Sequence, residues 1–370
     1  MTKRRFILFM LTVLVVAAVM PAQAAQSPKN VILLIGDGMG PAQVSLARLS
    51  LQTPLAMDSM QYAGFVKTQS ANSTITDSAA AGTALATGFK TNNGVISTLP
   101  DGKQVQTILE AAQRMGKAVG LVSTVTITDA TPAAFASHAE TRKSMADIAP
   151  QFLEKKVDVI LGGGRGYFIP KSQPDSKRED ERDLTSEAKS AGYVYADTRD
   201  GMISAKGSKL LGLFANSSMS SEPPQPTVAE MAEKAISIVS TDKDGFFVMI
   251  EGGQIDYACH SNDPAAAVKQ ILDFDAAVGK ALDFARTHTD TLVIVTADHE
   301  TGGMTIIYPN KGSAARFKVA FSTTGHSACN VPLLAFGPGA DRFGGVLDNT
   351  DVPKRIAQLW GIKGFAEVLQ

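Results

Sequence analysis

The sequence has little net charge of either sign. Its 35 Lys and Arg residues against 36 Asp and Glu leave a formal charge of -1, so no overall field attracts nucleic acid or an anionic membrane, and any basic chemistry must be local. Internal repeats and long low-complexity linkers are also lacking. With 44% hydrophobic and 19% charged residues, the composition is that of a globular protein and argues against a disordered or fibrous one.

Long hydrophobic runs are absent except near the N-terminus. Three basic residues at positions 3–5 precede an apolar run at 6–20, and small residues follow at 22–24. This pattern predicts a secretory signal peptide over residues 1–24, and hence a periplasmic or secreted protein without a stable membrane anchor after cleavage. An uncleaved anchor is the alternative, although the run is short for a membrane span.

Cysteine is scarce as well, with only Cys259 and Cys329 in 370 residues. In an oxidising compartment the two could pair, whereas most isolated cysteines in a chain of this length are simply buried. The sequence leaves both alternatives open.

Short apolar runs rich in Val, Ile and Leu alternate with segments of helical period. Runs without polar alternation are typical of parallel strands covered on both faces. Helices between them have recognisable starts, such as the capping box at Thr227 and the Asp263-Pro264 pair. The alternation predicts an α/β three-layer sandwich with a central, mostly parallel sheet covered by helices on both faces. Strands are expected at 31–35, 119–122, 157–161, 246–250, 292–295 and 331–336.

The segment 171–189 carries many charges of both signs and little apolar content. We interpret it as a solvated excursion and not as a binding patch. Because no long linker divides the chain, we expect residues 25–370 to form a single domain with surface insertions at about 165–226.

Acidic residues directly follow several of the expected strands: Asp37, Glu251 and the pair Asp298-His299. In open parallel sheets, ligands bind beyond the carboxyl ends of the strands. Carboxylates that converge there repel one another unless divalent cations neutralise them. A lone aspartate at such a position is usually a helix N-cap, but several together indicate a metal site.

Histidine is rare, with five in the chain, and three of the five stand beside other potential ligands. Asp256 and His260 are four residues apart, which places both on one side of a helix, and His326 lies in a glycine-containing segment. Mixed imidazole and carboxylate ligands suit zinc, whereas oxygen ligands alone suit magnesium. We interpret His288 as a surface residue and His138 as structural.

Ser78 precedes a run of small residues at 79–84 with good helix propensity. At a helix start, free backbone N–H groups and the helix dipole favour an anion, and a metal could activate the serine as a nucleophile. The alternative for Thr76-Asp77-Ser78 is an ordinary helix cap.

Most of the candidate ligands and Ser78 lie in six segments that follow one another along the chain. Through these segments the chain resembles the bacterial alkaline phosphatases over nearly all of its mature length. The segments are 35–40, 76–80, 129–133, 251–256, 296–299 and 325–327.

The resemblance implies an alkaline phosphatase that hydrolyses phosphate monoesters with broad specificity through a phosphoserine at Ser78. It also implies two zinc ions and one magnesium ion. The first zinc would be held by Asp256, His260 and His326. The second would be held by Asp37, Asp298, His299 and the Ser78 oxygen. The magnesium would be held by Asp37, Thr131 and Glu251.

Two further residues acquire roles only through the resemblance. Asp129 would act through a magnesium-bound water. Arg142, thirteen residues later, stands where the family has its phosphate-binding arginine, and its planar fork fits two phosphoryl oxygens. Read alone, Arg142 would look like a surface residue.

The sequence departs from the family pattern in two places. Tyr257 stands where relatives place a lysine, histidine or tryptophan that touches phosphate, which makes it a candidate substrate-binding residue. Only 26 residues separate His299 from His326, so the crown-like insertion of some relatives is expected to be short or absent. The sequence leaves open whether the protein forms a homodimer, and the dimer interface is expected to be reduced. Because Cys259 adjoins His260 and Cys329 follows His326 by three residues, a disulfide near the first zinc is one hypothesis.

Other readings compete with this one. A phosphodiesterase of the same superfamily would share the metal ligands, but its nucleophile is usually threonine and it lacks an equivalent of Arg142. A sulfatase would need a Cys/Ser-x-Pro-x-Arg pattern, which the segment starting at Ser78 lacks. An exported solute-binding protein would have no reason to carry the ligand set.

Overall fold

The computed structural model describes residues 27–51, 53–220, 222–308 and 316–369. The predicted signal peptide over residues 1–24 lies outside the described residues. Within them, no helix is both long enough and apolar enough to cross a membrane.

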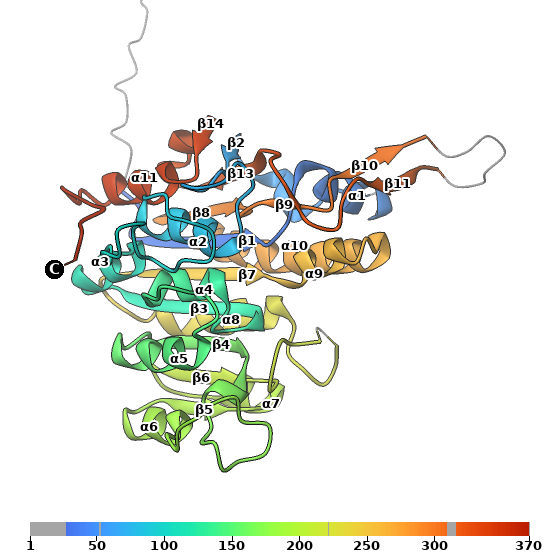
Figure 1. The fold of residues 1–370 in the computed structure, drawn as a ribbon. Coiled ribbons are helices and arrows are strands. Elements are labelled where there is room, and N and C mark those ends of the chain that lie inside the picture. The colour runs from blue at the N-terminus through green and yellow to red at the C-terminus, as the bar shows by residue number, and fades with distance from the viewer. Residues whose placement is uncertain (1–26, 52, 221, 309–315, 370) are drawn as a thin grey trace, which may run out of the picture.

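A ten-stranded sheet runs through the molecule in the order β14-β2-β13-β8-β1-β7-β3-β4-β6-β5 (Figure 1). Neighbouring strands are parallel except where β13 pairs with β2 and β8. The predicted mostly parallel sheet is therefore confirmed. The strands are β1 (Asn30–Gly36), β2 (Tyr62–Lys67), β3 (Ala118–Thr126), β4 (Val159–Gly163), β5 (Val194–Ala196), β6 (Leu210–Leu213), β7 (Phe246–Gly252), β8 (Thr291–Thr296), β13 (Val331–Phe336) and β14 (Gly345–Asp348).

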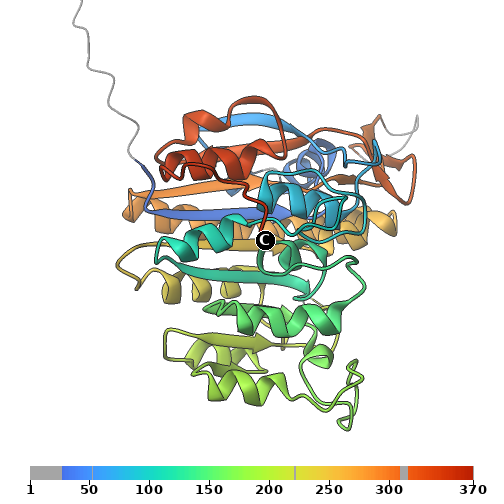
Figure 2. The same ribbon diagram turned by 60° about the vertical axis from the view of Figure 1, so that its left-hand side comes forward.

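Helices cover both faces of this sheet, as the two views in Figures 1 and 2 show. One face carries α8 and α10, which pack on each other, with α1 beside α10. The opposite face carries α2, α3, α4, α5 and α11, which contact one another in series. The helices of the first face are α1 (Pro41–Leu51), α8 (Val228–Val239) and α10 (Pro264–Thr287). Those of the second are α2 (Ser78–Thr87), α3 (Ile108–Arg114), α4 (Ala130–Ala136), α5 (Met145–Glu154) and α11 (Asp351–Leu359).

Local sequence signals explain several of these elements. The central strands β1, β7 and β8 are buried along their whole length, as runs without polar alternation require when both faces are covered. The hydroxyl of Thr227 caps α8 and is reciprocated by Glu230, which completes the predicted capping box. Asp263 caps α10, with Pro264 at its first turn.

The predicted insertion at about 165–226 contains short elements that extend the sheet beyond β4. They are η2 (Arg165–Tyr167), α6 (Leu184–Ser190), β5, α7 (Arg199–Ser204) and β6. The charged segment 171–189 is less solvated than expected, because Arg178 is 6% exposed. Its guanidinium pairs with Asp180 and donates to the carbonyl oxygens of Ala146 and Tyr167. A buried arginine with these partners packs the excursion against the body of the domain.

Between His299 and His326 the chain forms two small antiparallel sheets instead of a large insertion. β9 (Glu300–Thr301) pairs with β12 (His326–Ser327), and β10 (Met304–Ile307) pairs with β11 (Lys318–Phe321). Figure 1 shows β10 and β11 projecting from the body of the molecule.

Candidate active site

Three buried acidic residues meet at the carboxyl edge of the central strands. β1 lies between β7 and β8 in parallel register. Asp37 follows β1 directly, Glu251 is the last residue but one of β7, and Asp298 comes two residues after β8. Their exposed fractions are 8%, 1% and 1%. Because parallel strands end at the same edge, the carboxylates noted in the sequence come together there.

Candidate metal ligands form two groups. One consists of Asp256 and His260 from α9 (Gln254–His260) together with His326 from β12. The other consists of Asp37, Asp298 and His299. Within each group, one ligand atom from every residue lies within 4.8 Å of the others. The structure thus brings together the carboxylate and imidazole side chains that the resemblance assigns to the two zinc ions.

The histidines of these groups turn the same ring nitrogen toward the other ligands. Nδ1 of His260 lies 2.5 Å from the carbonyl oxygen of Thr324, and Nδ1 of His326 lies 2.9 Å from that of Thr76. A carbonyl oxygen only accepts hydrogen bonds, so each Nδ1 carries a proton and Nε2 is left to bind a metal. The two Nε2 atoms lie 3.2 Å apart, an arrangement that a shared cation would stabilise.

In the first group, the metal-binding nitrogen of His260 also faces a carboxylate. Nε2 of His260 lies 3.2 Å from Asp256 Oδ2. The hydrogen bond with Asp256 raises the pKa of His260 to about 9. A proton and a metal ion therefore compete for the same nitrogen.

The second group contains carboxylate oxygens that lack partners. Asp37 Oδ1 and Asp298 Oδ2 are buried without a hydrogen bond, and both face His299 Nε2, at 3.5 and 3.2 Å. Burial raises the pKa of Asp37 well above its ordinary value, and the charges of Asp298, Asp256 and Glu251 raise it further. Buried, mutually repelling carboxylates with free oxygens fit a divalent cation.

An oxygen-only group lies beside the second one. Burial raises the pKa of Glu251 to about 8, and its Oε2 accepts a 2.5 Å hydrogen bond from Ser123. The hydroxyl of Thr131, in α4, is buried and faces the carboxyl of Glu251, whose pKa it lowers in part. Together with Asp37, whose pKa the charge of Glu251 helps to raise, these hard oxygen donors fit magnesium.

Ser78 is the first residue of α2 and is 4% exposed. Its Oγ lies 3.2 Å from His299 Nε2, at the second group. Asp77 caps the helix by accepting from the backbone N–H of Ala80 at 3.0 Å. Every residue of α2 is buried, and a Cβ at Gly82 would lie 3.2 Å from the Cβ of Ala134. The small residues therefore allow α2 to lie close against α4.

Arg142 is held between two carboxylates. Its Nη2 donates to Asp129 Oδ1 at 2.8 Å, and its Nη1 donates to Asp77 Oδ2 at 3.2 Å. Burial by itself would lower the pKa of Arg142, but the charges of Asp129 and Asp77 raise it overall. The backbone N–H of Arg142 also donates to the carbonyl of Gly94 at 2.7 Å. The guanidinium is thus fixed near the start of α2, because its partner Asp77 directly precedes Ser78.

Tyr257 lies on α9 with its hydroxyl 3.4 Å from Asp129 Oδ2 and 3.4 Å from Ser218 Oγ. Its side chain is partly exposed. Burial, followed by the charge of Asp129, raises its pKa to about 12, so the phenol stays protonated and can donate. The structure therefore links Tyr257 to the partner of Arg142.

Reasoning from sequence missed Thr301. Its hydroxyl lies 2.5 Å from Asp256 Oδ1 and 3.2 Å from His299 Nδ1, so it joins the two ligand groups. Since the shorter contact is to a carboxylate, the hydroxyl donates there and accepts from His299 Nδ1, so that Nδ1 carries the proton and Nε2 can bind a metal. In the sequence, the only signal for Thr301 is its position two residues after the candidate ligand His299. Its contacts with Asp256 and His299 become visible only in the fold.

The disulfide hypothesis is contradicted. Cys259 is buried and Cys329 is exposed, and both are free. The sulfur of Cys259 instead lies 3.9 Å from Gln43 Nε2. Of the remaining histidines, His288 is exposed and stacks on Phe284, whereas His138 is buried and contacts Glu110.

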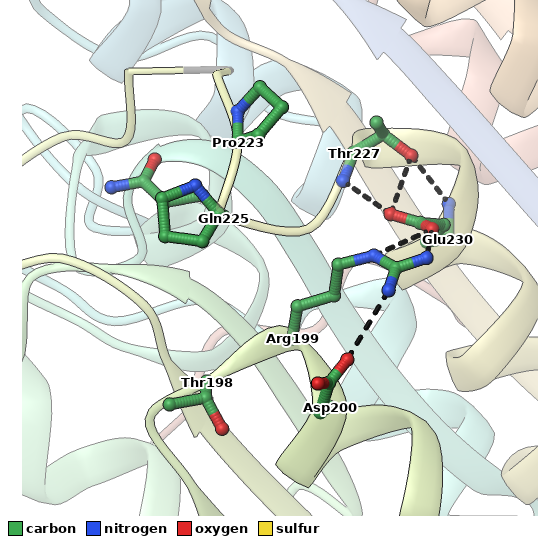
Figure 3. A pocket seen from close by; sticks show the side chains of 8 residues that line it. Thr198, Arg199, Asp200, Pro223, Gln225, Thr227 and Glu230 are labelled. Carbon is green, nitrogen blue, oxygen red and sulfur yellow. Dashed lines mark hydrogen bonds and ion pairs between the residues drawn. The ribbon is translucent and has the colours of Figure 1, made fainter.

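A surface cavity of about 680 Å³ lies elsewhere, between the N-termini of α7 and α8. Figure 3 shows Arg199 joined there to Glu230 and Asp200. None of the residues that line this cavity is a candidate ligand, nucleophile or phosphate-binding residue. We therefore place the chemistry at the sheet edge.

Comparison with known proteins shows the family of this chain. The family model for alkaline phosphatase matches residues 28–315. Alkaline phosphatase 3 of Bacillus subtilis strain 168 is 35% identical over 417 residues, covering 89% of this chain and 88% of the relative.

Two solved structures are similar over most of both chains. Alkaline phosphatase from the Antarctic bacterium TAB5 is 35% identical, with a TM-score of 0.85, over 91% of this chain and 99% of that one. A variant of the TAB5 enzyme has magnesium bound in a site called M3. It is 35% identical, with a TM-score of 0.82, and covers 90% of this chain and 98% of its own.

Proposed function

The chain belongs to the alkaline phosphatase family and is a metal-dependent phosphomonoester hydrolase, and we propose that it acts by transient phosphorylation of Ser78. The observation that carries this proposal is the position of Ser78 Oγ, 3.2 Å from His299 Nε2 and next to Asp77, which holds Arg142. A nucleophile, a metal-binding group and a phosphate-binding fork thus share one small volume.

We assign two zinc ions to the imidazole-containing groups and one magnesium ion to the group with oxygen ligands. The unpartnered buried oxygens and the inward-facing Nε2 atoms support this assignment. When bound, the metals supply positive charge that favours the serine alkoxide and stabilises the entering and leaving oxygens. The ligands of the first zinc are Asp256, His260 and His326. Those of the second are Asp37, Asp298, His299 and Ser78. Those of the magnesium are Asp37, Thr131 and Glu251.

The chain's own residues orient the phosphoryl group. Arg142 offers two N–H groups in a plane to two phosphoryl oxygens, a match that lysine cannot make. Asp129 and Asp77 orient the guanidinium through one hydrogen bond to each of its terminal nitrogens. Ser78 Oγ forms the new P–O bond as the ester P–O bond breaks and the alcohol leaves. Water then attacks phosphorus, so that inorganic phosphate is released and the Ser78 hydroxyl is restored.

Because recognition concentrates on the phosphoryl group, we expect broad tolerance of the alcohol. Tyr257 would touch bound phosphate or a water beside it, since its hydroxyl reaches Asp129. Asp129 would act through a magnesium-bound water. We further propose a periplasmic or secreted location from the pattern at residues 1–24, and we keep a homodimer as an expectation for solution measurements.

The test is p-nitrophenyl phosphate hydrolysis from pH 7 to 11, for protein as purified, after chelation, and after return of zinc and magnesium. We expect activity that rises at alkaline pH, requires metal and is lost in Ser78→Ala. A matched control is Ser204→Ala, on α7 and outside the site. Full activity of Ser78→Ala would refute the phosphoserine step. Faster hydrolysis of a diester such as bis-p-nitrophenyl phosphate would favour the phosphodiesterase alternative.

A further inference from the structure

Glu300 is a buried carboxylate at the back of the metal ligands, with a 2% exposed fraction. Its Oε1 accepts from Gln43 Nε2 at 2.7 Å and from the backbone N–H of Met304 at 3.0 Å. Its Oε2 accepts from the backbone N–H of Gly303 at 3.2 Å and from the hydroxyl of Ser327. All four donors are neutral. A carboxylate buried among several neutral donors fixes the segments that supply them.

The segments that Glu300 joins either carry a ligand or closely follow one. Glu300 itself follows His299, and Ser327 follows His326. Gln43 belongs to α1, which begins four residues after Asp37, and its Nε2 also donates to the carbonyl of Thr301 at 2.8 Å. One carboxylate therefore ties together three stretches of chain that hold ligands of both groups.

Close packing supports this connection. A Cβ at Gly40 would lie 2.3 Å from Glu300 Cγ, so only glycine lets the turn after Asp37 rest against Glu300. The backbone N–H of Thr301 donates to the carbonyl of Gly38 in that same turn. The arrangement holds the turn and β9 as one unit.

The strand that carries His326 is short, and most of its flanking residues are exposed. β12 is only two residues long and pairs with β9, Ser327 opposite Glu300. Residues 322–324 and 328–330 on either side are exposed. Besides the contact of His326 Nδ1 with the carbonyl of Thr76 and the pairing with β9, the Ser327–Glu300 hydrogen bond links this strand to the protein interior.

We propose that Glu300 is a positioning residue for the metal site: it sets where His326 stands relative to the ligands that follow β1 and β8. This inference rests on the proposed ligand assignment and adds a residue outside it. Groups that hold metal ligands in place from the second layer typically contribute 10- to 100-fold to metal affinity.

Zinc affinity of the apo-protein, measured by competition with a chromophoric chelator, tests the proposal. For Glu300→Gln we expect a loss of about 10- to 100-fold, because the amide places an N–H₂ group against donors. Ser327→Ala, which removes one donor, is expected to lose less, on the order of threefold to tenfold. Circular dichroism and thermal melting of each apo-variant report whether it is folded.

Glu110→Gln is the control, because Glu110 is also buried, at 8%, and has several hydrogen bonds, but lies on α3. It should melt at a lower temperature with zinc affinity unchanged. Wild-type zinc affinity in a folded Glu300→Gln, or in Ser327→Ala if Glu300→Gln does not fold, would overturn the inference. An equal loss of zinc affinity in Glu110→Gln would also overturn the inference, because it would show that lower stability in general weakens zinc binding. A wild-type protein that binds no zinc would instead refute the ligand assignment itself.

Discussion

At the scale of single residues, the guanidinium of Arg142 shows how a surface-looking side chain becomes part of a site. Nothing in its local sequence marks it, and two of its N–H groups contact Asp129 and Asp77. Both partners lie far from it in sequence, by 13 and 65 residues. The structure fixes its orientation through charge-assisted hydrogen bonds, which are stronger than neutral ones.

Replacement of Arg142 by lysine should weaken phosphate binding although the charge is kept. A lysine cannot donate in parallel to two oxygens, and loss of a hydrogen bond to a charged group costs about 1.5–3 kcal/mol, or about 10- to 100-fold in affinity. We expect a corresponding rise in KM and in the inhibition constant of phosphate. Arg199→Lys, at an exposed ion pair with Glu230, is the control. Unchanged phosphate inhibition in Arg142→Lys would contradict the assignment.

Tyr257→Phe should have a small effect. Both contacts of the hydroxyl are 3.4 Å long, at the weak end for hydrogen bonds, and the phenol is partly exposed. We expect less than about 1 kcal/mol, or up to about fivefold in KM, because a typical net hydrogen bond contributes about that much. Steady-state kinetics on the variant measure this. A loss in kcat of two orders of magnitude would show that the hydroxyl takes a direct part in the reaction.

At the scale of helices and strands, a second buried network holds the segment that leads to Arg142. Glu110 on α3 contacts His138, four residues before Arg142, and Lys155 at the end of α5. Burial by itself would raise the pKa of Glu110, but hydrogen bonds from His138, Lys155 and the backbone of Thr107 lower it to about 2. The network thus ties α3, α5 and the chain after α4 together.

This network predicts acid sensitivity. Because the pKa of Glu110 in the folded state lies below its ordinary 4.5, the stabilisation is complete above about pH 5 and is lost as the pH falls toward 2. A difference of this size corresponds to on the order of 3 kcal/mol. Urea unfolding at pH 6 and pH 3 should therefore show a larger loss for wild type than for Glu110→Gln. Parallel losses in both proteins would show that this carboxyl does not control the effect.

At the same scale, the long elements follow from sequence and the short ones do not. Capping residues and unbroken apolar runs mark α8, α10 and the central strands, because burial on both faces demands such runs. β9 and β12 are two residues each, too short for any periodic pattern. Their pairing places Ser327 opposite Glu300, a contact between residues far apart in the sequence.

At the scale of the whole molecule, the sheet edge concentrates negative charge that the protein alone does not neutralise. Asp37, Glu251 and Asp298 are almost fully buried there, and burial raises the pKa of Asp37 and of Glu251. Bound cations would remove this repulsion, so metal binding and folding are coupled.

Chelation should therefore lower the thermal stability of the whole domain. With free metal at 100 to 1,000 times the dissociation constant, binding adds about 2.7–4.1 kcal/mol. We expect a lower melting temperature in the presence of a chelator and recovery when zinc and magnesium return. Ser78→Ala keeps the carboxylate and imidazole ligands and should melt close to wild type in both conditions. A melting temperature indifferent to metal would argue against a site of this kind.

The sequence by itself determined the layers of the fold and the acidic strand ends, because these depend on local patterns and on residue types. Arg142 and Asp129 were marked as candidates only through the resemblance to a family. The sequence did not determine which nitrogen of each histidine faces the ligands, that Thr301 joins the two groups, that Glu300 ties three segments together, or that the cysteines stay apart. Those features depend on contacts between residues tens to hundreds of positions apart, and only the packed chain brings such residues within hydrogen-bonding distance.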